Sequence, residues 1–205
     1  MPTLLYSGNL GLGQDLGTVL RAVSHLNGDA NLHVLIVGNG TGLASVKELA
    51  SELQLHHIEF RDPVSLYKLP ELLAVGDVHL VCQKLGTEGL LVPSKIYSTL
   101  AIGRPVIFIG PQHCEVAQIV HESDCGFVVA PGDVESAAKV LKQLAVDADL
   151  CRQMGERAKT YYEKHFGRKR SVAQIISVIE RVAGTGRPVR QAVPNSPTAE
   201  QELRR

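Results

Sequence analysis

The sequence alternates short aliphatic runs with longer amphipathic segments, and this alternation restricts the fold more than any other feature. Several of the runs are continuous in Val, Ile and Leu, as is typical of strands buried on both faces of a parallel sheet. The runs predict strands at residues 3–7, 33–37, 58–60, 78–82, 106–109 and 126–129. The segments between them predict helices at 16–26, 42–53, 66–75, 94–102, 115–122 and 134–144. Such a chain is expected to form an α/β fold, a Rossmann-like, doubly wound parallel sheet of about six strands with right-handed crossovers.

The part of the chain after the last expected strand is predicted to be helical. Asp133 is a candidate N-cap for the helix at 134–144. A further helix at 172–182 has an apolar stripe that includes Ile175, Ile176 and Ile179. From Gly184 on, the composition changes to Gly, Pro, polar and Arg residues. We therefore expect one domain over residues 1–183 and a disordered tail over 184–205.

Charge and cysteine content exclude several classes of protein. The chain has 21 Lys and Arg against 21 Asp and Glu, so no overall field attracts it to nucleic acid or to an acidic membrane. The local cluster at residues 168–170 is expected to be a solvated helix start. Four cysteines lie far apart without a C-x-x-C pair, which argues against a zinc site or a disulfide framework. No apolar stretch approaches the roughly 20 residues of a membrane span, so a cytosolic location is expected.

Two glycine-rich loops follow the first two expected strands, where open α/β sheets bind ligands. The first contains Gly8, Gly11 and Gly13, and the second contains Gly38 and Gly40. Glycines let a backbone approach a phosphate closely, and a following helix supplies free N–H groups. Both loops equally fit tight turns that need positive φ. The spacing G-x-x-G-x-G differs from the dinucleotide fingerprint, and no carboxylate closes the second strand, which disfavours an NAD-dependent enzyme.

The loop after the fourth expected strand contains the strongest candidates. Glu88 precedes Gly89, and Pro93, Ser94 and Lys95 open the next helix. Proline suits a first helical turn, and Ser94 could cap the helix or bind an oxygen. A helix N-terminus with a lysine attracts anions. A plain helix start explains the same three residues equally well. The spacing alone does not decide between a helix start and an anion site.

Residues 88–107 resemble the donor-site signature of the family-four retaining glycosyltransferases. They are most similar to the bacterial branch that builds colanic acid, capsule and O-antigen sugars, where a V-P-S-K segment precedes a helix ending A-x-G-R-P-V-I. Segments 6–11, 125–129 and 131–133 agree, and the resemblance covers residues 3–183. It implies one half of a GT-B fold, in which two Rossmann-like domains face a cleft. This chain would be the nucleotide-sugar-binding C-terminal domain, with the N-terminal acceptor domain absent from it.

The resemblance also implies roles for individual residues. Glu88 matches the family's first glutamate, which meets hydroxyls of the donor sugar, while Ser98 stands where the second glutamate contacts the ribose. Asn9 and Gln14 stand where many relatives place an arginine and a lysine against the diphosphate. We expect Lys95 to replace those cations, with help from backbone N–H groups of residues 11–14. Glu88 and Lys95 are thus the expected catalytic residues. The expected donor-binding residues are Gly8, Asn9, Gly11, Gly13, Gln14, Gly38, Gly40, Pro93, Ser94 and Ser98.

The chemistry that the resemblance implies is retaining transfer of a sugar from a nucleoside diphosphate, with UDP expected as the nucleotide. The family that the chain resembles generally works without a metal, so the resemblance implies that no metal and no cofactor are expected. The acceptor would be a saccharide or a lipid-linked sugar, which adds the inner face of the cell membrane to the expected locations. A non-catalytic nucleotide-sugar-binding fragment and half of a GT-B nucleotide-sugar epimerase are the alternatives. His113 is expected in a surface loop, and Glu115 equally fits a ligand contact or stabilisation of a helix N-terminus.

Overall fold

The computed structural model describes residues 1–11, 13–26 and 32–184. Residues 185–205, nearly all of the expected disordered tail, lie outside the described residues, as does Leu12 in the first glycine loop. The described chain divides into two compact units, the first Met1–His165 and the second beginning at Phe166. The boundary expected after Ala183 falls within the second unit.

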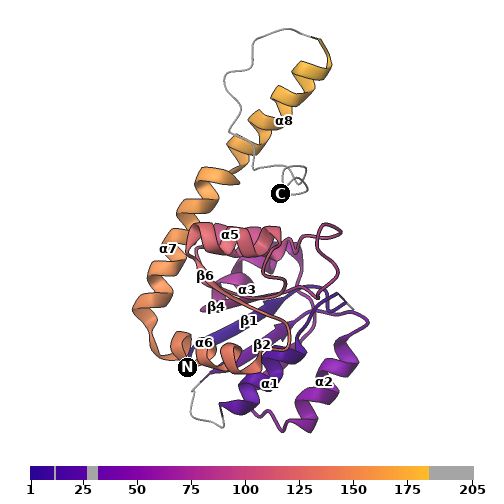
Figure 1. The fold of residues 1–205 in the computed structure, drawn as a ribbon, viewed down its shortest axis with the longest axis vertical. Helices are drawn as coiled ribbons and strands as arrows, with labels where there is room; N and C mark the ends of the chain where they lie inside the picture. Colours follow the sequence, from indigo (N-terminus) through magenta and orange to yellow (C-terminus); the bar gives the residue numbers. More distant parts are fainter. Residues whose placement is uncertain (12, 27–31, 185–205) are drawn as a thin grey trace, which may run out of the picture. The chain divides into compact units, whose positions relative to one another are not determined.

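The first unit contains all six predicted strands in one parallel sheet (Figure 1). They are β1 (Thr3–Ser7), β2 (His33–Val37), β3 (Ile58–Arg61), β4 (Val78–Cys82), β5 (Val106–Ile109) and β6 (Gly126–Val129). The strand order is β3-β2-β1-β4-β5-β6, with every neighbouring pair parallel. In the register Leu5 of β1 aligns with Leu35 of β2 and with His79 of β4. The predicted doubly wound α/β fold is confirmed.

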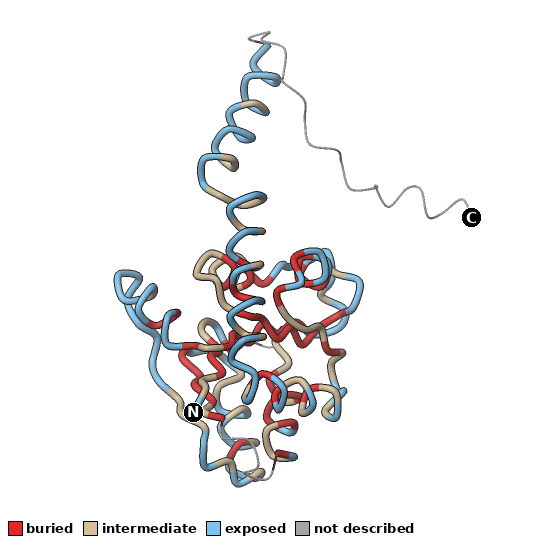
Figure 2. The backbone as a smooth tube through the Cα atoms, turned by 90° about the vertical axis from the view of Figure 1, so that its left-hand side faces the viewer, coloured by how far each residue is buried: buried red, intermediate tan, exposed pale blue. Residues whose placement is uncertain are grey.

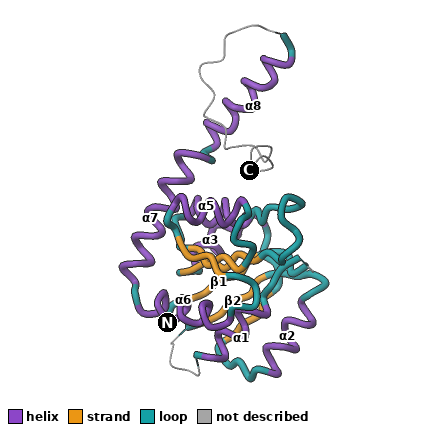
Figure 3. Tube along the Cα trace, viewed as in Figure 1, coloured by secondary structure: helices purple, strands orange, loops and turns teal. Residues whose placement is uncertain are grey.

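Both faces of the sheet are buried, and this explains why its strands read as continuous aliphatic runs (Figure 2). Leu4 and Ile36 pack on one face with α1 (Gly17–His25) and α6 (Val134–Val146). Leu5 and Leu35 pack on the other face with α3 (Leu69–Val75). Burying one such side chain fully contributes about 1.5–3 kcal/mol. The strands lie between the helical layers in Figure 3.

Most helices agree with the sequence prediction to within one or two residues. They are α2 (Leu43–Glu52), α4 (Lys95–Ile102) and α5 (Glu115–Ser123), together with α1 and α6. Asp133 is the N-cap of α6, as predicted, because its side chain accepts a hydrogen bond from the Ser136 amide. The segment predicted as one helix at 66–75 is instead a 3₁₀ turn, η1 (Leu66–Lys68), followed by α3. Pro70 lies in the first turn of α3, where its missing N–H fits a helix start better than a helix interior.

The helix α7 (Ala148–His165) lies in the part of the chain that was predicted to be helical, but the sequence pattern did not give its bounds. Its buried residues are Met154, Gly155 and Ala158, so its packing face combines one large apolar side chain with two small residues. A Cβ atom on Gly155 would lie 2.3 Å from the carbonyl oxygen of Gly103, at the end of α4. Because α7 packs on the end of α4 through close backbone contact, it shows less of the apolar periodicity from which an amphipathic helix is predicted.

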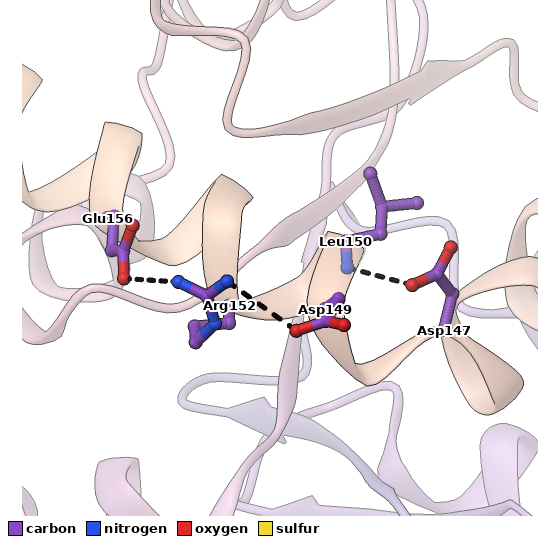
Figure 4. A network of polar contacts seen from close by, with 5 residues as sticks. All are labelled: Asp147, Asp149, Leu150, Arg152 and Glu156. Atoms are coloured by element: carbon purple, nitrogen blue, oxygen red, sulfur yellow. Dashed lines mark hydrogen bonds and ion pairs between the residues drawn. The ribbon is translucent and has the colours of Figure 1, made fainter.

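The junction of α6 and α7 is held by polar contacts at the surface (Figure 4). Asp147 accepts a hydrogen bond from the Leu150 amide at 2.8 Å, which satisfies one free N–H at the start of α7. Arg152 pairs with Glu156 at 2.8 Å and with Asp149 at 3.5 Å. Exposed ion pairs of this kind contribute little to stability, so the capping contact explains where α7 begins better than the charges do.

The described part of the second unit contains one helix, α8 (Arg168–Val182). It begins four residues before the predicted helix at 172–182, and Arg168, Lys169 and Arg170 form its first turn, which confirms the helix start expected at this basic cluster. None of its residues is buried, and its apolar side chains, including Ile175 and Ile179, are exposed. Among the described residues no helix is long and apolar enough to cross a membrane.

Candidate functional site

The strand order places a topological switch point between β1 and β4. The chain leaves β1 towards one end of the sheet and leaves β4 towards the other, so the loops after these strands separate at their carboxyl ends. Open parallel sheets bind ligands in that crevice. The loops concerned are residues 8–16 after β1 and 83–94 after β4, and they are joined by a hydrogen bond from the Lys84 amide to the Gly13 carbonyl, 2.9 Å long. Most of the residues predicted to bind the donor lie in these two loops.

The two glycine-rich loops are locked to one another through their backbones. The Gly8 amide donates to the Val37 carbonyl at 2.9 Å, and the Leu10 amide donates to the Asn39 carbonyl at 2.9 Å. A Cβ atom on Gly38 would lie 1.9 Å from the Gly8 carbonyl oxygen, and one on Gly40 would lie 2.4 Å from that of Leu10. These two glycines are therefore required by loop packing, whether or not they also touch a ligand.

Asn9 and Gln14, the neutral residues at positions predicted to face a diphosphate, lie in the loop after β1. Asn9 is exposed, and its carbonyl accepts a hydrogen bond from the Tyr6 hydroxyl at 2.6 Å. The side-chain oxygen of Gln14 is buried and has no hydrogen-bond partner among the described residues. The amides of Gly11 and Gln14 belong to the described backbone, whereas that of Leu12 does not. The loop thus offers polar groups but no positively charged side chain for an anion.

Lys95 supplies a positive charge at this edge of the sheet. It is the first residue of α4, and its Nζ lies 4.7 Å from the centroid of the Tyr6 ring at the end of β1. No carboxylate lies within 4.0 Å of this ammonium among residues 1–11, 13–26 and 32–184. Burial lowers the pKa of Lys95 below its usual value. The nearby Cys82 thiol gives no counter-charge, because burial raises the pKa of Cys82 far above its usual value and keeps it neutral.

Pro93, Ser94 and Ser98 lie around the first turn of α4. Pro93 is buried and precedes the helix, and Ser94 occupies the N-cap position. Ser94 was predicted either to cap the helix or to bind an oxygen. The capping alternative is wrong for its side chain, which makes no capping hydrogen bond. Its φ and ψ of −59° and −16° are helical, unlike the extended geometry that favours side-chain capping. The Ser98 hydroxyl donates to the Lys95 carbonyl at 2.9 Å. Ser94 therefore keeps an exposed hydroxyl at a helix N-terminus.

Glu88 lies in an exposed turn between β4 and α4. Gly86 and Gly89 on either side have φ of 81° and 74°, which lets the chain turn sharply there. Within the part of the chain that the structure describes, Glu88 has no ion-pair partner. Its carboxylate is thus accessible from solvent.

Tyr97 and Glu115 connect α4 to α5 near the same edge. The Tyr97 hydroxyl donates to a Glu115 carboxylate oxygen at 2.6 Å. Burial, followed by this hydrogen bond, raises the pKa of Tyr97 to about 12. Glu115 lies in the first turn of α5, so it faces both a helix N-terminus and a tyrosine. His113 is exposed in the preceding loop, as predicted.

Sequence reasoning missed the tyrosines, Tyr6 and Tyr97. Tyr6 is the one aromatic residue of β1, and its place after Leu4 and Leu5 was the only sequence signal for it. The described ranges contain no group of three His, Cys, Asp or Glu side chains arranged to hold a metal ion.

A hollow of about 530 Å³ lies at the opposite, amino-terminal edge of the sheet. Pro2, Asp77 and Pro105 line it just before β1, β4 and β5 begin, and Arg152 and Glu156 of Figure 4 also line it. None of the predicted donor-binding residues reaches it. The switch point, where those residues do gather, is therefore the candidate site.

Comparison with known proteins gives matches in sequence and in fold. The model of the family described as glycosyl transferases group 1 matches residues 1–161. WcaI of Escherichia coli (strain K12), named as a proposed glycosyl transferase of colanic acid biosynthesis, is 33% identical over 178 residues, which are 86% of this chain and 42% of that protein. The N-acetyl-alpha-D-glucosaminyl L-malate synthase of Bacillus anthracis is 27% identical over 174 residues, 83% of this chain and 43% of that protein.

Among solved structures, Anabaena Alr3699/HepE in complex with UDP-glucose superposes with a TM-score of 0.73. It is 15% identical in sequence and covers 87% of this chain and 48% of that chain. At that identity the likeness concerns the fold alone. The chain spans less than half the length of the curated relatives it matches.

Proposed function

This chain belongs to the glycosyl transferases group 1 family, and from that premise we propose that its switch point binds a nucleoside-diphosphate sugar for glycosyl transfer. We propose a UDP-sugar as the donor and a saccharide or lipid-linked sugar as the acceptor, bound by a further domain. The observation that carries the proposal is the Lys95 ammonium, which lies at the end of β1 without a carboxylate partner among the described residues.

A diphosphate leaving group is the anion that suits this ammonium. As the glycosidic bond breaks, its electron pair passes to the diphosphate, and negative charge develops there. Fixed donors placed at such a charge are worth about 3–4 kcal/mol each in the transition state. Lys95 would supply the charge, while the Gly11 amide and the N-terminus of α4 would add partial positive charge; the Gln14 amide already donates to the Gly11 carbonyl at 3.4 Å. Because the protein would provide this stabilisation itself, we propose a reaction that needs no metal.

Glu88 is assigned to the sugar. Its exposed carboxylate in the turn before α4 can accept hydrogen bonds from donor hydroxyls. In the proposed retaining reaction the acceptor oxygen attacks the face from which the diphosphate departs, and the departing diphosphate takes the acceptor proton. No nucleophile of the protein is then required, and Glu88 acts by orienting the sugar.

Calorimetry tests the proposal directly. Titration of the chain with UDP, UDP-glucose, UDP-N-acetylglucosamine and NAD should give binding of the uridine ligands and none of NAD. Lys95→Ala should weaken UDP binding and reduce its salt dependence, because one charge contact is lost. Lys142→Ala, at an exposed position of α6, is the matched control and should change neither. Equal UDP affinity in wild type and Lys95→Ala would remove the basis of the proposal.

A binding domain that performs no transfer by itself is the second candidate. The observation that favours it is the extent of the match, because the chain corresponds to only 42% of the length of WcaI. Incubation with a labelled UDP-sugar and an acceptor mixture separates the possibilities. A labelled glycan indicates transfer, an isomerised nucleotide sugar without acceptor consumption indicates an epimerase, and binding without product indicates the second candidate.

A further inference from the structure

The side chain of Lys95 follows a defined path across the end of β1. A Cβ atom on Gly8 would lie 2.6 Å from Cε and 3.2 Å from Nζ of Lys95, so the lysine stem occupies the space that a side chain at position 8 would need. The ammonium at the end of this stem lies 4.7 Å from the centroid of the Tyr6 ring. Gly8 and Tyr6 together therefore determine where the charge lies.

The Tyr6 ring is itself held on all sides. Tyr6 is completely buried within the core that includes Leu4 and Ile36. Its hydroxyl donates to the Asn9 carbonyl at 2.6 Å, so the polar end of the side chain is anchored to the loop after β1. A ring fixed at both ends presents its face in one orientation, and the face of an aromatic ring attracts a cation.

Lys95 has few other groups to hold it. The described residues supply neither a carboxylate nor a hydrogen-bond acceptor for its Nζ. A lysine side chain has several rotatable bonds, and ordering it when a ligand binds costs about 0.5–1.5 kcal/mol. Contact with the ring restricts the ammonium before the ligand arrives, and it leaves the N–H groups free to donate to an anion.

We propose that Tyr6 is a positioning residue, whose ring face holds the Lys95 ammonium at the site of the diphosphate while its hydroxyl anchors the loop at Asn9. This inference rests on the proposed function, since the diphosphate is the anion to which Lys95 is assigned. The ring and the hydroxyl of Tyr6 thus have different tasks. Tyr6→Phe removes only the hydroxyl, whereas Tyr6→Leu removes both.

The first test needs no ligand. A ring face shifts the NMR signals of protons above it upfield, so the Lys95 Hε signals should lie upfield of those of exposed lysines. Tyr6→Phe should keep this shift, and Tyr6→Leu should abolish it. Tyr67→Leu is the matched control, since Tyr67 is 94% exposed in η1 and should leave Lys95 unaffected. An unshifted Lys95 signal in the folded wild-type chain would overturn the inference, even if Tyr6→Leu failed to fold.

The second test is a double-mutant cycle on UDP affinity, with thermal unfolding of each variant as the control for folding. Tyr6→Leu should weaken binding by about two- to tenfold, the cost of ordering a free lysine. Tyr6→Phe should bind within about twofold of wild type, because the ring remains. In a Lys95→Met chain, which itself binds UDP weakly, Tyr6→Leu should cause no further loss.

The outcomes separate the inference from the proposed function. Absence of UDP binding by wild type, or full binding by Lys95→Met, contradicts the proposed function. Weakened binding in Lys95→Met together with unchanged binding in Tyr6→Leu contradicts the role of Tyr6 alone. Equal, additive losses from Tyr6→Leu in both backgrounds would show that Tyr6 only supports the fold.

Discussion

The imidazole of His79 in β4 and the hydroxyl of Thr99 in α4 meet in the interior, with 3.2 Å between Nδ1 and Oγ1. The other ring nitrogen, Nε2, lies 3.0 Å from the Leu73 carbonyl oxygen, which can only accept a hydrogen bond. Nε2 therefore carries the proton of a neutral ring, and Nδ1 faces the Thr99 hydroxyl, whose single proton can go either to Nδ1 or to the Lys95 carbonyl. The Thr99 hydroxyl also lies 3.0 Å from the Lys95 carbonyl, so this buried network supports the turn that carries Lys95.

This arrangement predicts a stability that depends on pH. Burial lowers the pKa of His79 to about 4, against an ordinary value near 6.5. Between these values the unfolded chain binds a proton at His79 that the folded chain does not, so the free energy of unfolding should fall as pH falls from about 6.5 to about 4. The loss attributable to His79 is up to about 3 kcal/mol. Urea unfolding of wild type and His79→Leu at pH 7 and pH 5 checks it. An equal fall in both chains would exclude His79 as the cause.

The half-buried Lys95 predicts that ligand binding weakens at high pH, whereas His79 lowers stability at low pH. Because burial lowers its pKa, Lys95 loses its charge at a lower pH than an exposed lysine does. UDP affinity should therefore decline as pH rises through this lowered pKa. Calorimetric titration between pH 7 and pH 10 measures the decline. Lys95→Arg keeps its charge over that range and should show only the part that comes from titration of UDP itself. Identical profiles for the two chains would contradict the prediction.

The contact between the two glycine loops predicts a sharp difference between two glycines. Gly38→Ala would bring a Cβ atom to 1.9 Å from the backbone oxygen of Gly8, and a backbone atom cannot move aside as a flexible side chain can. Overpacking and backbone strain together should cost about 3 kcal/mol or more of unfolding free energy. Gly86→Ala meets nothing within 4 Å and should cost only about 1–2 kcal/mol for its φ of 81°. Chemical unfolding of both variants measures the difference, and comparable losses would mean that the loops yield easily.

Glu88 should affect sugar recognition without affecting stability. It is exposed in a turn, so Glu88→Gln should unfold at the same temperature as wild type. If its carboxylate accepts hydrogen bonds from donor hydroxyls, the substitution should weaken UDP-sugar binding by about 1.5 kcal/mol, roughly tenfold, and leave UDP binding unchanged. Parallel titrations with UDP and UDP-glucose make the comparison. A loss that is equal for both ligands would place Glu88 at the nucleotide rather than at the sugar.

The sequence predicted the sheet better than it predicted the helices or the site. Runs such as residues 34–37 and 106–109 are continuous in apolar residues because both faces of the sheet are covered, and that pattern is visible in the sequence alone. The bounds of α7 were not predicted, because Gly155 and Ala158 pack it closely and Met154 is the only large apolar residue among its buried residues. The site loops were predicted from their position after strands, but Tyr6 was overlooked because a tyrosine in a buried strand ordinarily fills the core.

By itself, the sequence determined the α/β class, six strands and the loops in which the candidate residues lie. These properties follow from local patterns: the period of apolar residues, the glycine and proline positions and the charges beside them. Only the tertiary structure decided that Lys95 crosses Gly8 to lie over Tyr6, that Gly38 is required by the carbonyl of Gly8, and that His79 supports α4 through Thr99. Each of these contacts joins segments far apart in the chain, and their distances depend on how the strands are ordered and packed, which no local pattern encodes.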